Sequence, residues 1–151
     1  MLKLSALRYI SLFLFVAIIS SCIKPPDYPD EPVIEFFSLN SNLLIEQQDD
    51  LIITFSFTDG DGDLGSEDSL NVFLEDMRVP GFIRPFKIPF IPPRGHHKAI
   101  SGEIQLTLPS NTVSCVLNTE MDTLVYSITI EDRAGNVSNA ILTPDILIEC
   151  Q

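Results

Sequence analysis

The stretch Leu51–Thr58, with the sequence LIITFSFT, decides the fold. Every second residue is apolar, so that Leu51, Ile53, Phe55 and Phe57 share one face of an extended chain. The opposite face carries hydroxyl side chains from Thr54 onward. A period of two is typical of a β-strand with one buried face and one face in water.

Other segments repeat this pattern or are short and apolar. The strands expected beside Leu51–Thr58 are Val33–Leu39, Leu70–Glu75, Ile100–Leu108, Leu124–Ile130 and Ala140–Cys150, the last of them broken by Pro144. No window shows the apolar stripe of a helix. About seven strands joined by turn residues predict an all-β fold, an antiparallel immunoglobulin-like β-sandwich over residues 33–151. Strand order does not follow from this pattern.

The composition supports one folded domain and excludes one class of partner. Apolar residues make up 45% of the 151 residues, which is enough to form a core. The formal net charge of −12 opposes binding to nucleic-acid phosphates.

The N-terminus is typical of an export signal. Lys3 and Arg8 precede Tyr9–Ser20, which is almost continuously apolar and shorter than the roughly 20 residues that span a membrane. We therefore expect residues 1–21 to be a signal peptide. The alternative is a retained membrane anchor.

The end of this segment, Ile19-Ser20-Ser21-Cys22, resembles the bacterial lipobox. The resemblance implies that Cys22 is lipidated, becomes the new N-terminus and holds the protein on the outer membrane of the cell envelope. A plain secretory signal that happens to contain a cysteine is the alternative. Residues 22–32 are rich in Pro and acids, and they predict an extended tether.

Two further cysteines, Cys115 and Cys150, follow the inward positions of their segments. An exported protein meets oxidising conditions, so an even pair favours a disulfide. Two buried free thiols remain the alternative.

The most chemically distinctive stretch is an acidic loop after Thr58. Asp59, Asp61 and Asp63 alternate with glycines in the sequence DGDGD. Carboxylates this close repel one another unless a cation lies between them, and oxygen ligands of this kind suit Ca²⁺. The loop is not an EF-hand, because Leu64 and Leu70 stand where that motif requires Gly and Glu.

A second oxygen-rich segment, Glu131, Asp132 and Asn136, follows another predicted strand. In an immunoglobulin-like sandwich the two loops lie at the same pole, so all six residues are candidate ligands of one calcium ion. The alternative is a solvated Asp-Gly turn with Arg133 as a nearby cation.

The segments FSFTDGDGDLG and EDRAGNVSN, behind a lipobox, resemble an uncharacterised class of Bacteroidetes-type lipoproteins. The second segment also resembles the D-x-AGN segment of bacterial immunoglobulin-like repeats. The resemblance implies a periplasmic or surface β-sandwich and supplies no activity.

The insert 78–98 is basic and rich in proline. Pro85 and Pro89 exclude a helix, so we expect an extended segment. Its Phe side chains either cover a sheet face or, with Arg84, bind a partner; the candidates for binding are Phe82, Arg84, Phe86 and Phe90. His96 and His97 are expected to be solvated.

The sequence carries no catalytic or phosphate-binding motif, and we expect no enzymatic activity. Two hypotheses follow. The first is a membrane-anchored structural or interaction module with a calcium-stabilised pole. The second is a lipoprotein that binds a glycan or peptide through the insert, the partner being an unknown envelope protein or glycan.

Overall fold

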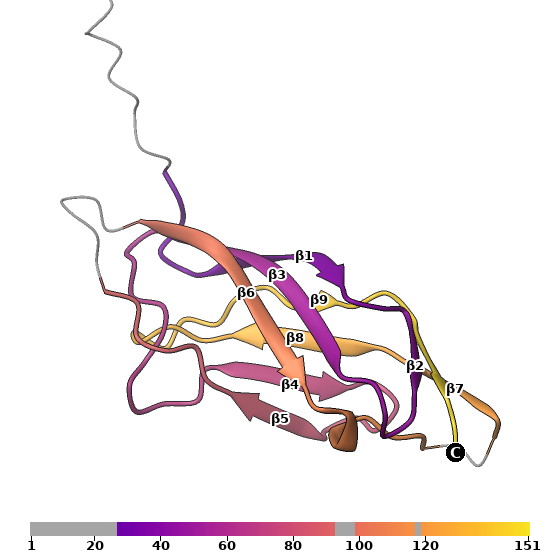
Figure 1. Cartoon of the computed structure of the whole chain (residues 1–151). Coiled ribbons are helices and arrows are strands. Elements are labelled where there is room, and N and C mark those ends of the chain that lie inside the picture. The colour runs from indigo at the N-terminus through magenta and orange to yellow at the C-terminus, as the bar shows by residue number, and fades with distance from the viewer. Residues whose placement is uncertain (1–26, 93–98, 117–118) are drawn as a thin grey trace, which may run out of the picture.

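The computed structural model describes residues 27–92, 99–116 and 119–151 (Figure 1). The predicted signal peptide, Cys22, His96 and His97 lie outside these ranges. No helix within them has the length and apolar character needed to cross a membrane.

The described chain is built from short strands and one turn of 3-10 helix at Ser110–Thr112. The strands are β1 (Val33–Leu39), β2 (Leu43–Ile45), β3 (Leu51–Asp59), β4 (Val72–Asp76), β5 (Ile83–Phe86), β6 (Ile100–Leu108), β7 (Met121–Leu124), β8 (Tyr126–Ile130), β9 (Ile141–Leu142) and β10 (Ile146–Glu149).

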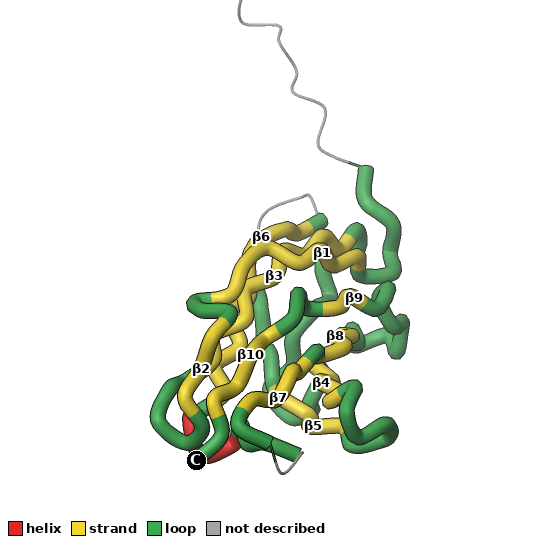
Figure 2. The backbone as a smooth tube through the Cα atoms, turned by 90° about the vertical axis from the view of Figure 1, so that its right-hand side faces the viewer, coloured by secondary structure: helices red, strands yellow, loops and turns green. Residues whose placement is uncertain are grey.

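Two layers of strands face each other (Figure 2). One layer has the order β1-β3-β6, and the other has the order β5-β4-β8-β9. A small sheet, β2-β10-β7, continues the second layer, because β7 leads into β8 and β10 follows β9. The pairs are antiparallel except β2 with β10. The predicted all-β sandwich, with mainly antiparallel pairing, is confirmed.

The core lies between the layers and follows the alternation of the sequence. The inward residues Leu51, Ile53 and Phe55 of β3 are fully buried. They face an inward row of β7 and β8 that includes Tyr126 and Ile128. Each such side chain contributes about 1.5–3 kcal/mol on burial, so this double row is the main source of stability.

Strand bounds differ from the sequence expectation where side chains interrupt the pattern. β4 begins at Val72 rather than Leu70, because Leu70 is exposed and Asn71 turns inward. The buried amide of Asn71 accepts a hydrogen bond from the backbone N–H of Ile88 at 2.6 Å. The insert is extended at Ile83–Phe86, as expected, and this strand, β5, is an edge strand, a position that tolerates Pro85.

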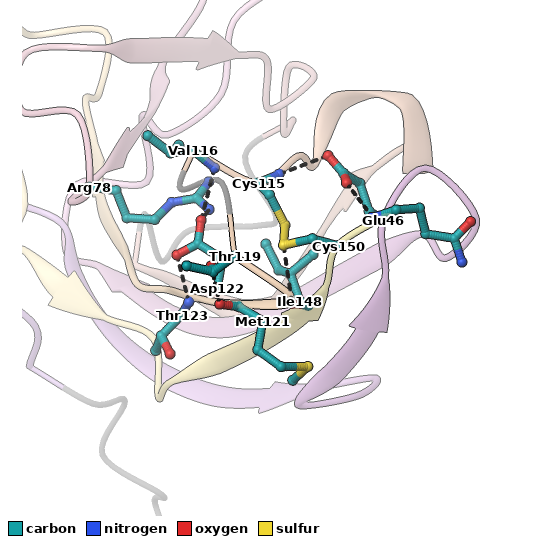
Figure 3. Close-up of a disulfide and its surroundings, with 11 residues drawn as sticks. Glu46, Arg78, Cys115, Val116, Thr119, Met121, Asp122, Thr123, Ile148 and Cys150 are labelled. Carbon is teal, nitrogen blue, oxygen red and sulfur yellow. Dashed lines mark hydrogen bonds and ion pairs between the residues drawn. A yellow bond between two sulfur atoms is a disulfide. The ribbon is translucent and has the colours of Figure 1, made fainter.

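The end of the sandwich that carries the disulfide is called the distal pole (Figure 3). A disulfide joins Cys115 to Cys150, with 5.9 Å between their Cα atoms. The Glu46 carboxylate accepts N–H bonds from Cys115 and Gln151, which hold its pKa below the ordinary value. The chain after β6 is thereby fastened to the end of β10.

The distal pole also contains a partly buried arginine with two carboxylates. Arg78 donates to Asp76 at 2.8 Å and to Asp122 at 2.7 Å. Burial alone would raise the pKa of Asp122. The N–H groups of Val116 and Thr123, together with the charge of Arg78, outweigh burial and hold this pKa below its ordinary value. The ionised carboxylate is therefore part of the folded structure.

We expect the double variant Cys115→Ala/Cys150→Ala to lose about 3–4 kcal/mol of unfolding free energy. The disulfide closes a loop across a sequence separation of 35, and its removal restores conformational entropy to the unfolded chain. Urea unfolding of the purified protein measures the loss, and intact mass under non-reducing conditions verifies the bond. A loss below about 1 kcal/mol would show that this bond contributes little.

We expect Asp122→Asn to lower the unfolding free energy by about 3 kcal/mol at pH 7, because it leaves a buried charge under-compensated. The lowered pKa of Asp122 means that its contribution is present above the unfolded pKa of about 3.9 and is lost as pH falls through the lower folded value. The gap between wild type and variant should thus narrow below about pH 4 in urea titrations. The exposed Asp145, changed to Asn, serves as the control. A gap that is constant with pH contradicts the assignment.

Candidate metal site at the acidic pole

The opposite end of the sandwich, called the acidic pole, begins where the inward row of β3 ends in a carboxylate. Asp59 continues the series of Phe55 and Phe57, and none of its surface is exposed. A side chain at this position faces the core, where an apolar group would normally lie. A buried carboxylate is costly unless its charge is compensated.

The loop after Asp59 folds back, so that its carboxylates converge. Gly62 and Gly65 have φ values of 70° and 86°, a left-handed conformation that favours glycine. Carboxylate oxygens of Asp59, Asp61 and Asp63 all lie within 4.8 Å of one another. The glycines therefore permit the convergence that the DGDGD spacing predicts.

One oxygen of each carboxylate is buried without a partner. The Oδ1 atoms of Asp59, Asp61 and Asp63 have no hydrogen bond within the described chain. By contrast, Oδ2 of Asp59 accepts the backbone N–H of Leu64 at 2.8 Å. A buried acceptor left unpaired costs about 1–3 kcal/mol, so three of them together make this loop a candidate cation site.

The electrostatics of the loop agree with this geometry. Burial, with smaller contributions from Asp61 and Asp63, raises the pKa of Asp59 to about 6, although the N–H of Leu64 opposes the shift. Burial and the neighbouring Asp132 and Asp61 also raise the pKa of Asp63, although Arg133 opposes the shift. Carboxylates this close repel one another when they are charged.

The second oxygen-rich loop meets the first, as the predicted topology requires. The backbone N–H of Arg133 points at the carbonyl of Asp63 at 3.4 Å, and its Nη1 donates to the carbonyl of Gly65 at 2.7 Å. The Arg133 guanidinium also lies over the ring of Phe90, 5.0 Å from its centroid. The ion pairs found among the described residues are those of Arg78, so the acidic loop has none there.

Only three of the six candidate ligands lie in one cluster of carboxylates in the described chain. Asp59, Asp61 and Asp63 form one cluster. Asp132 is buried beside Asp63, but its two oxygens accept the backbone N–H and the side-chain amide of Asn136, both at 2.8 Å. Glu131 lines an adjacent cavity of about 410 Å³ with Arg133. Asn136 therefore orients Asp132 and does not point its amide into the cluster.

The three clustered carboxylates are close enough together for one cation to contact all of them. Oxygens bound to one Ca²⁺ at about 2.4 Å lie at most about 4.8 Å apart. Calcium takes six to eight oxygen ligands, so the three side chains would supply only part of its coordination. A second group, Glu46 with Cys115 and Cys150, has its sulfurs in a disulfide and offers no thiolate.

The candidate binding residues of the insert do not form one surface. Phe82 is exposed at the turn between β4 and β5, with Arg84 5.3 Å from its ring centroid. Arg84 donates to the carbonyl of Thr112, and Phe86 packs on the core. Phe90 lies at the acidic pole against Arg133. The insert therefore covers the sandwich along most of its described length.

Sequence reasoning missed two contacts of the acidic loop. A Cβ on Gly65 would lie 2.3 Å from the carbonyl oxygen of Pro89, so the insert packs directly on this glycine. A Cβ on Gly60 would lie 2.3 Å from the carbonyl oxygen of Tyr28, in the predicted tether. The only signal in the sequence is the glycines themselves, which indicate a close approach without naming the partner.

Comparison with models of known protein families finds no family that matches this chain, and a search among curated proteins finds no matching relative. The fold and the acidic pole therefore define the class of protein, an all-β sandwich with a candidate metal site in the loops at one end.

Proposed function

We propose that this protein is a non-catalytic, membrane-anchored structural or interaction module of the bacterial cell envelope, stabilised at its acidic pole by calcium. One observation supports the calcium proposal above all. Three buried carboxylate oxygens converge without partners at the end of a core strand.

The same observation favours a structural ion over a catalytic one. Catalytic metal sites keep an open position for water or substrate. The unpartnered oxygens of Asp59, Asp61 and Asp63 are buried, so an ion among them would be shielded from solvent on the side of these three residues. Such an ion stabilises the fold by binding only the folded state.

The envelope assignment is supported by the sequence and by the disulfide. The lipobox-like Ile19–Cys22 favours an N-terminal lipid that holds the protein on the outer membrane. The Cys115–Cys150 disulfide suits an oxidising compartment such as the periplasm or cell surface. The partner in the envelope is a protein or a glycan.

We expect Ca²⁺ at 100 times its dissociation constant to raise the melting temperature of chelator-treated protein by about 10 °C. Asp59→Asn should abolish most of this shift, because it removes a buried ligand charge. In chelator, the same variant should melt no lower than wild type, because the amide relieves repulsion among the three carboxylates. Differential scanning calorimetry measures both effects.

Asp68→Asn is the matched control for this experiment. It removes one charge from the same acidic stretch, at an exposed position outside the cluster. Its calcium shift should equal that of wild type. If wild-type protein shows no shift with Ca²⁺, the calcium proposal is wrong.

A glycan- or peptide-binding role is the second candidate, and a specific exposed patch favours it. The turn between β4 and β5 exposes four apolar side chains, Met77, Val79, Phe82 and Ile83. An exposed aromatic beside an arginine is a common anchor for a partner. In this form of the proposal, Phe86 and Phe90 support the fold while Phe82 makes the contact.

For this second role we expect Phe82→Ala to weaken binding at least tenfold on an array of envelope glycans and peptides, with an unchanged melting temperature. Phe37→Ala is the control, because Phe37 is an equally large exposed ring on β1 of the other layer. Equal binding by wild type and both variants would rule out the turn as the anchor.

A further inference from the structure

The predicted tether is in contact with the acidic loop. The described chain begins at residue 27 and reaches β1 at the same end of the sandwich as the acidic loop (Figure 1). The backbone N–H of Gly60 donates to the carbonyl oxygen of Pro29 at 2.8 Å. We call Tyr28 and Pro29 the strap.

Only a glycine leaves room for this contact. A Cβ on Gly60 would lie 2.3 Å from the carbonyl oxygen of Tyr28 and 2.6 Å from that of Pro29. Gly60 is not among the glycines with positive φ, so its own backbone does not require glycine. The requirement for glycine at position 60 therefore comes from the close approach of the strap.

Gly60 also joins two members of the carboxylate cluster. Its peptide neighbours are Asp59 and Asp61, so a movement that separates their carboxylates moves the N–H that holds the strap. We propose that calcium binding at the cluster docks the strap, which makes the direction in which the N-terminal chain leaves the domain dependent on calcium. This inference rests on the calcium site proposed above.

The charges near the strap determine whether calcium favours or opposes its docking. Asp27, Asp30 and Glu31 flank the strap, so docking brings further negative charge toward a loop that already carries three carboxylates. A bound cation offsets this repulsion, and its absence favours release of the strap. By linkage, the docked strap must strengthen calcium binding by the same factor by which calcium strengthens docking.

The released segment has a defined limit. Pro32 is buried, and the backbone of Ile34 exchanges two hydrogen bonds with the side chain of Asn139, both at 2.9 Å. β1 therefore stays in its sheet whether or not the strap is docked. The movement is confined to the chain before Pro32.

Limited proteolysis of the purified full chain tests the proposal. A protease that cleaves after acidic residues attacks the bonds Asp27–Tyr28 and Asp30–Glu31, and intact mass identifies the products. We expect cleavage at these bonds to be at least tenfold slower with Ca²⁺ than with chelator. Calcium affinity is measured on the same samples by titration calorimetry.

Gly60→Ala should make cleavage equally fast with and without Ca²⁺ and should weaken calcium affinity, while a calcium-dependent rise in melting temperature remains. Gly102→Ala is the matched control. It adds the same methyl group at the same end of the sandwich, where the added carbon meets only the ring of Phe57. This variant should behave as wild type does.

The outcomes separate the two proposals. If Ca²⁺ raises the melting temperature of wild type but leaves its cleavage rate unchanged, the strap proposal is overturned and the calcium site stands. If Ca²⁺ changes neither quantity, both proposals fail. If Gly60→Ala does not fold, the test uses wild type alone. Cleavage that slows over the same range of Ca²⁺ concentration in which the melting temperature rises supports the strap proposal. A cleavage rate that does not change over this range overturns it.

Discussion

The alternation of β3 is the constraint on which the rest of the structure depends. A strand turns every second side chain inward, so the row that supplies Leu51, Ile53 and Phe55 to the core also directs Asp59 inward at its end. The chain cannot expose this carboxylate without shifting the register of nine paired residues with β6. The fold therefore forces a charge into a buried position, and the loop that follows must compensate it.

The two poles of the sandwich treat buried charge in different ways. At the distal pole, Arg78 lies between two carboxylates. The N–H of Val116 donates to the same Asp122 oxygen as Arg78, and the N–H of Thr123 donates to the other. At the acidic pole, Asp132 is bonded by Asn136, yet Asp59, Asp61 and Asp63 each keep a buried oxygen without a partner. The same chain therefore pairs its buried carboxylates at the distal pole and leaves three buried oxygens unpaired at the acidic pole. The unpaired oxygens at the acidic pole are therefore the observation that supports the proposed cation.

Period-two patterns predicted the long strands because a half-buried strand has apolar residues on its buried face and polar residues on its exposed face. β1 and β6 have the predicted bounds, and β3 extends by one residue. β2 is too short to carry such a pattern, and its parallel pairing with β10 joins chain segments about a hundred residues apart. The convergence of the three aspartates was predictable from spacing. The contacts of Gly60 with Tyr28 and of Gly65 with Pro89 were not, because they depend on how distant segments pack.

The acidic loop is held in place by contacts with segments that are distant in the sequence. The tether reaches it at Gly60, the insert at Gly65, and the loop after β8 through Arg133. Three segments distant in sequence thus contact a run of seven residues. At the distal pole, distant segments are joined by the Cys115–Cys150 disulfide, a covalent bond that does not depend on a bound ion. The described N-terminal chain also enters the domain at the acidic pole, where the carbonyl of Pro29 accepts the N–H of Gly60.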